Sequence, residues 1–110
     1  MPTVEFYRDR DRSEPVDDYF TALAERGEAA RVASLAHSIE LMEEEGYPLP
    51  GDKLIDRTAR IWETRIGPHR VAYAQVGEVI WLLHAWRKRS QKLDDREARR
   101  AVRRLRELIR

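Results

Sequence analysis

Basic side chains recur where three consecutive strands are expected to end. Arg65 closes an alternating segment, and Arg70 opens the apolar segment that follows. Lys88, Arg89 and Lys92 come after a third segment, which is apolar almost throughout. Like charges held together cost stability unless an anion neutralises them, and phosphate suits guanidinium and ammonium groups well. These residue types at this spacing predict a phosphate site, although the same residues scattered in solvent would need no ligand.

Three side chains with rings are further candidates for functional residues: a histidine and a tryptophan in the third segment, and a histidine in a turn. His84 and Trp86 lie two residues apart and share a face of the predicted strand. His84 is either a hydrogen-bonded core residue or a general acid or base, and Trp86 is either core or a platform that stacks on an RNA base. His69 lies in the Gly67-Pro68-His69 turn and is expected to be exposed, where it could contact a substrate.

Several other kinds of chemistry find no support in the sequence. The chain contains no cysteine, which excludes disulfides, a thiol nucleophile and a cysteine-bound zinc site. No spacing of His, Asp and Glu indicates a metal site, and no glycine-rich phosphate loop occurs. We therefore expect neither a metal nor a cofactor. No apolar run reaches the length of a signal peptide or a membrane span, so a soluble, cytoplasmic protein without a membrane partner is expected.

Charge is divided unevenly along the 110 residues, although the formal net charge is only +1. Residues 1–55 hold 6 basic and 13 acidic side chains, whereas residues 56–110 hold 15 basic and 7 acidic ones. An arginine-rich half favours nucleic acid or an acidic protein as the partner, because arginine binds phosphate through two parallel hydrogen bonds. A solvated arginine-rich helix face is the alternative.

Hydrophobic periodicity predicts the elements that position these residues. Strands are expected over residues 3–8, 61–66, 70–76 and 79–86. A helical hairpin is expected over residues 14–45, with its first helix ending at Gly27. A final helix is expected from Asp94, which forms a capping-box pattern with Glu97. Residues 47–59 are then a long loop that carries Lys53.

This element order, βααβββα, predicts one small α+β domain over residues 1–110 with a mainly antiparallel sheet. Short turns at Gly67-Pro68 and Gly77-Glu78 require antiparallel pairing of the last three strands. In such a meander alternate strand ends meet at one edge of the sheet. Arg65, Arg70 and Lys88 are therefore expected at the same end.

Four motifs follow one another along the chain from residue 53 onward. They are Lys53-Leu54, Ile61-Trp62-Glu63-Thr64-Arg65, Arg70-Val71-Ala72-Tyr73 and Leu82-Leu83-His84-Ala85-Trp86-Arg87-Lys88-Arg89-Ser90-Gln91-Lys92. In this order they resemble the RelE/ParE superfamily of bacterial toxins, in particular its HigB-like, phage-derived branch, over nearly the whole chain. The resemblance implies a RelE-like fold and the toxin of a type II toxin–antitoxin system.

In activity, the resemblance implies a metal-independent endoribonuclease that cleaves messenger RNA on the ribosome and arrests growth. It also implies a helix-turn-helix antitoxin as partner, in a toxin–antitoxin hetero-oligomer. Residue by residue, Arg65 and Arg70 would hold the scissile phosphate, and Lys88 would serve leaving-group or base chemistry.

The remaining matches are candidate RNA contacts. Arg89 and Lys92 would grip the flanking backbone, and Lys53 would reach in from the side. His84 and Trp86 complete the predicted RNA-binding set. Arg89 stands where the family has lysine, Trp86 where it has phenylalanine, and the tail lacks the tyrosine that some members place near the active site.

Two other functions stay open at this stage. A related branch poisons gyrase without nuclease activity, and a catalytically silent module could use the same basic face to bind RNA or antitoxin. The placement of arginine and lysine favours the nuclease.

Overall fold

The computed structural model describes residues 2–90 and 95–110, so the predicted site residue Lys92 and the predicted helix start at Asp94 lie outside the described residues. The elements follow in the order β1 (Thr3–Phe6), α1 (Pro15–Glu25), α2 (Ala29–Glu45), β2 (Lys53–Asp56), β3 (Ile61–Ile66), β4 (His69–Val76), β5 (Val79–Arg87) and α3 (Asp95–Leu108). The predicted α+β class, with a helical hairpin and a C-terminal helix, is confirmed. No helix within the described ranges is long and apolar enough to span a membrane.

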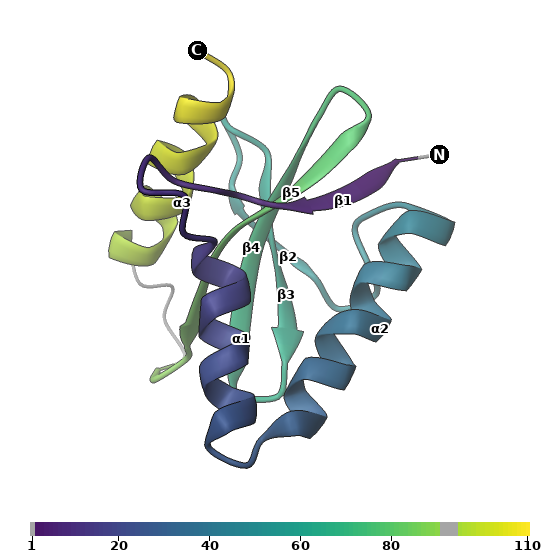
Figure 1. The fold of residues 1–110 in the computed structure, drawn as a ribbon. Helices are drawn as coiled ribbons and strands as arrows, with labels where there is room; N and C mark the ends of the chain where they lie inside the picture. Colours follow the sequence, from purple (N-terminus) through teal and green to yellow (C-terminus); the bar gives the residue numbers. More distant parts are fainter. Residues whose placement is uncertain (1, 91–94) are drawn as a thin grey trace.

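The described strands form one sheet in the order β1-β5-β4-β3-β2 (Figure 1). β1 runs parallel to β5, and the other neighbours are antiparallel. Both hairpin turns contain two residues and begin with a glycine at φ +61°, in Gly67-Pro68 and Gly77-Glu78. A positive φ at the first position suits the tight turns that match strand twist. The three central strands therefore form the meander that the sequence predicts.

The long loop predicted over residues 47–59 is wrong in part. Lys53–Asp56 forms the edge strand β2, in which Lys53 pairs with Glu63 and Leu54 with Trp62. Four residues with only two apolar side chains carry almost no alternation. This strand forms because the free edge of β3 supplies backbone hydrogen-bonding partners.

The two faces of the sheet have separate cores. α1 and α2 diverge as a V from their short connection (Figure 1) and cover one face, where Phe20, Leu23 and Met42 pack on the sheet. α3 covers the other face with Ala101 and Leu105. The alternation in β3 assigns its side chains to these faces, so that Ile61, Glu63 and Arg65 share the α3 side.

The end of α1 shows why the hairpin turns where predicted. The amide of Gly27 donates to the carbonyl of Ala24 at 3.0 Å, and that of Glu28 donates to the carbonyl of Leu23 at 2.9 Å. This pair of bonds is a Schellman motif, which requires a left-handed residue, and Gly27 has φ +90°. α2 therefore begins within a few residues of the end of α1.

A bulge in the β4–β5 pairing redirects part of β5. Ala72 pairs with His84, but the next residue, Tyr73, pairs with Leu82. The extra residue is Leu83, which packs in the core beneath α3. The bulge lets Leu83 join that core while His84 and Trp86 stay on the same side of the sheet.

Candidate functional site

One open pocket of about 500 Å³ collects basic side chains from four segments of the chain. Its lining residues are Lys53, Arg65, Arg70, Lys88, Arg89 and Ser90. They come from β2, β3, β4 and the segment directly after β5. The structure thus brings together five of the six cations that the sequence nominated, the sixth being Lys92.

Arg65 and Arg70 are direct cross-strand partners in the β3–β4 ladder. Side chains at such positions project from the same face and lie close together. Nη1 of Arg70 donates to the carbonyls of Gly67 at 2.8 Å and His69 at 2.9 Å. The backbone amide of Lys88 donates to the carbonyl of Pro68 at 2.9 Å. The tight turn therefore holds both a guanidinium and the start of the lysine segment in place.

A buried carboxylate lies beside this cluster. Glu63 is 2% exposed, and its Oε2 atom lies 3.9 Å from Nε of Arg70. Oε1 of Glu63 and Nε of Arg70 are both buried without a hydrogen bond. A buried negative charge reduces the mutual repulsion of the cations and favours one placement of Arg70. We did not assign Glu63 a role from sequence, although its two-residue spacing from Arg65 places both on one face.

Two hydrogen bonds to Asp52 position the chain directly before Lys53, a residue that was predicted to lie in a loop. The hydroxyl of Tyr73 donates to Oδ2 of Asp52 at 2.5 Å, and the amide of Leu49 donates to the same oxygen at 3.2 Å. Burial and the neighbouring Asp52 carboxylate raise the pKa of Tyr73, so it stays a donor. The start of β2 is thereby tied to β4, and Lys53 enters the pocket from that side.

His84 and Trp86 lie beneath α3 and do not line the basic pocket. They are 6% and 7% exposed, and their rings stack with centroids 5.2 Å apart. Nε2 of His84 bonds Oε1 of Glu97 at 2.8 Å, and its Nδ1 lies 3.0 Å from Nη1 of Arg104. Guanidinium only donates, so Nδ1 accepts and Nε2 carries the proton.

Burial lowers the pKa of His84, and the positive charge of Arg104 acts in the same direction, while Glu97 opposes both. The imidazole is therefore neutral, and both of its nitrogens are engaged. In this arrangement the ring joins the sheet to α3, and it supports Trp86 by stacking.

The expected exposure of His69 is wrong. It is 1% exposed on the α1 side, where its Nδ1 bonds the hydroxyl of Tyr19 at 2.7 Å. Because the turn contains only two residues, His69 pairs with Ile66 as part of β4. Burial lowers the pKa of His69, an effect that the nearby Glu28 carboxylate opposes.

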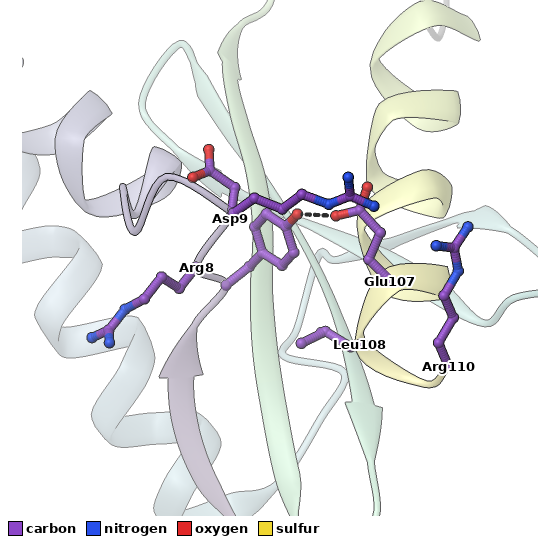
Figure 2. Close-up of a pocket in the computed structure, with 7 residues that line it drawn as sticks. Arg8, Asp9, Glu107, Leu108 and Arg110 are labelled. Atoms are coloured by element: carbon purple, nitrogen blue, oxygen red, sulfur yellow. Dashed lines mark hydrogen bonds between the residues drawn. The ribbon is translucent and has the colours of Figure 1, made fainter.

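A second network, which we did not anticipate from sequence, joins α3 to Tyr7, the residue directly after β1. Nη1 of Arg104 donates to the carbonyl of Leu83 at 2.9 Å, and its guanidinium lies 5.5 Å from the ring centre of Tyr7. The hydroxyl of Tyr7 donates to Oε2 of Glu107, the dashed bond in Figure 2. Burial and this carboxylate raise the pKa of Tyr7 to about 12. α3 is therefore held across the sheet from β1 to the β5 bulge.

The basic pocket is suited to a phosphodiester. Preorganised guanidinium and ammonium groups stabilise negative charge that develops on phosphate oxygens. Among residues 2–90 and 95–110, no group of three His, Asp or Glu side chains is placed to hold a metal ion. The basic groups that line the pocket can supply electrostatic stabilisation and proton transfer.

Comparison with known proteins identifies a family. The family model described as "Phage derived protein Gp49-like (DUF891)" matches residues 19–106, a range that contains every residue lining the pocket. No curated protein gives a significant match to the chain.

Proposed function

Because the chain belongs to the phage-derived Gp49-like family, part of the RelE/HigB-like toxin group, we propose that it is the toxin of a type II toxin–antitoxin system and cleaves messenger RNA on the ribosome. Membership of a toxin family also implies an antitoxin partner. We propose that this partner is a helix-turn-helix protein that forms a hetero-oligomer with the toxin. The observation that carries the nuclease proposal is the Arg65–Arg70 cross-strand pair in the basic pocket.

In the proposed reaction the 2′-oxygen of the RNA attacks the adjacent phosphorus and the bond to the 5′-oxygen breaks. The products are a 2′,3′-cyclic phosphate and a free 5′-hydroxyl. Arg65 and Arg70 hold the non-bridging oxygens and stabilise the added charge of the phosphorane. Each such donor contributes about 3 kcal/mol to lowering the barrier, or on the order of 100-fold in rate.

In this proposal Lys88 is the proton donor. Its ammonium group donates a proton to the departing 5′-oxygen, and the 2′-proton passes to water at the open side of the pocket. Arg89 and Lys53 contact the phosphates on either side of the scissile one. Arginine at position 89 keeps the charge of the family's lysine and has no part in the proposed proton transfer.

Induced expression in a bacterial host, followed by RNA sequencing of the cleavage ends, tests the proposal. The wild-type protein should arrest growth and leave 5′-hydroxyl ends in messages. The Arg65→Ala/Arg70→Ala variant should do neither. Arg10→Ala/Arg26→Ala is the matched control, because it removes two exposed arginines outside the basic pocket and should behave like the wild type.

Other outcomes would contradict the nuclease. Arrest that persists in a folded Arg65→Ala/Arg70→Ala variant would remove the assignment of the site. Arrest with intact messages and induced DNA repair would indicate a gyrase poison. RNA binding without cleavage or arrest would indicate a silent binding module.

A further inference from the structure

A second basic surface lies on α3, apart from the pocket described above. Four arginines and Arg96 line an open groove of about 650 Å³ together with Asp56 and Val102. The four are Arg99, Arg100, Arg103 and Arg106, and all are exposed. We call these four residues the α3 arginine face.

The carboxylates of α3 neutralise this face only in part, through the interaction by which Arg103 helps to lower the pKa of Glu107. Glu97 is bonded to His84. Glu107 accepts the hydroxyl of Tyr7, the dashed bond in Figure 2. Asp95 lies in the first turn, where it interacts favourably with the helix dipole. Asp56, at the edge of the groove, accepts the amide of Ala59 at 2.7 Å. In the part of the chain that the structure describes, no arginine of the face forms an ion pair.

This arrangement costs stability in the absence of a partner. Arg99 and Arg103 are four residues apart, and Arg103 and Arg106 three apart, so their side chains are neighbours along the helix. Like charges at these spacings destabilise a helix by a few tenths of a kcal/mol per pair. A polyanion bound along the helix would turn this destabilising contribution of the arginines into a stabilising one.

We propose that the α3 arginine face is a docking surface for the sugar–phosphate backbone of double-stranded RNA. Arg99 and Arg106 are seven residues apart, which spaces their Cα atoms by about 10 Å along the axis. Guanidinium groups over this length can contact successive phosphates beside one groove of a duplex, which proteins recognise mainly by shape and phosphate contacts.

The residues that line the groove favour duplex RNA over a single strand or a protein as the partner. Binding of single strands relies on aromatic side chains that stack on bases, and none of the described residues that line this groove is aromatic. A protein interface has an apolar centre, whereas Val102 is the one apolar side chain among the lining residues that the structure describes. Phosphate contacts without base stacking or an apolar anchor fit a duplex backbone.

Docking of duplex RNA on the α3 arginine face does not depend on cleavage in the basic pocket. The two surfaces lie at opposite ends of β2, since Lys53 lines the pocket and Asp56 lines the groove. One RNA-containing scaffold could therefore occupy the groove while a single strand enters the pocket.

Binding measurements on the full chain test the proposal. The probes are a fluorescent RNA duplex of about 16 base pairs and a single strand of equal length, both 2′-O-methylated to prevent cleavage. Arg99→Gln/Arg103→Gln/Arg106→Gln should weaken duplex binding at least about tenfold and reduce the magnitude of the salt slope by about 2 to 3 between 50 and 200 mM. Glutamine preserves helix propensity, and circular dichroism checks the fold.

The matched control is Arg8→Gln/Arg12→Gln/Arg26→Gln, which removes three exposed arginines and the same charge from other parts of the surface. It should change duplex affinity less than about twofold. Equal weakening by both triple variants, or none by the α3 variant, would overturn the proposal, as would displacement of the duplex by an equimolar acidic helical peptide. Arg65→Ala/Arg70→Ala should weaken the single strand alone, so failure of the pocket and failure of the α3 arginine face are distinguishable.

Discussion

The carboxylate of Glu63 lies 3.9 Å from Nε of Arg70, and the side chains are only 3% and 11% exposed. Two opposite charges are thus held together out of water directly behind a cluster of cations. Removing one member of such a pair leaves the other charge buried without compensation, which costs far more than removing both. We therefore expect Glu63 to act on the pocket through Arg70, as a positioning residue.

We expect Glu63→Gln to lower the free energy of unfolding by about 3 kcal/mol in urea titrations. RNA cleavage should fall about tenfold, because the placement of Arg70 is no longer fixed. The Glu63→Gln/Arg70→Gln variant should recover part of the stability but none of the cleavage. Stability losses that simply add in the double variant would show that the two residues are not coupled.

A second prediction compares the loss of the Arg104 side chain with the loss of its neighbour, Arg103. Arg104→Met leaves the Leu83 carbonyl and Nδ1 of His84 without a donor, and should cost about 2 kcal/mol. Arg103→Met removes the same charge from an exposed position and should stay within about 0.5 kcal/mol of the wild type. Thermal unfolding of both variants checks the contrast, and equal losses would refute the structural role of Arg104.

Stability should fall on the acidic side of neutrality. Burial lowers the pKa of His69 and His84 in the folded protein, so the unfolded chain takes up protons first as the pH falls. The contribution of these neutral rings is complete above the unfolded pKa of about 6.5 and is lost as the pH drops from there toward the folded values.

The melting temperature should therefore decrease between pH values of about 7.5 and 5. His69→Gln and His84→Gln should each reduce this decrease, even if they lower the melting temperature at neutral pH. His37→Gln, a change at an exposed position on α2, is the control and should keep the full decrease. A decrease of unchanged size in both buried variants would assign the acid sensitivity to other groups.

Alternation and turn signals were sufficient to predict the meander and the meeting of Arg65, Arg70 and Lys88 at one end of it. These features depend on local sequence, since a two-residue turn determines which strand ends meet. β2 could not be predicted this way, because an edge strand of four residues depends on a partner supplied by the rest of the fold. The roles of Glu63 and Arg104 likewise depend on residues that become neighbours only in the folded chain.

The predictions for the aromatic and imidazole rings show a similar limit. Residue type and spacing placed His84 and Trp86 correctly on one face, but not under α3. Whether a strand residue faces solvent or a helix depends on what packs there, and α3 lies downstream in the chain. The prediction that His69 is exposed was wrong for a different reason. It assumed that His69 belongs to the turn, whereas the turn contains two residues and His69 is the first residue of β4.

The parallel pairing of β1 with β5 has a consequence for the order of assembly during synthesis. Thr3 pairs with Val79, and the bond from Tyr7 to Glu107 closes a separation of 100 residues. The hairpins that carry Arg65 and Arg70 close over short distances and form early, whereas distant pairings form slowly. The segment that carries β1 and Tyr7 leaves the exit tunnel before its partners and reaches its place only after β5 and α3 have been made.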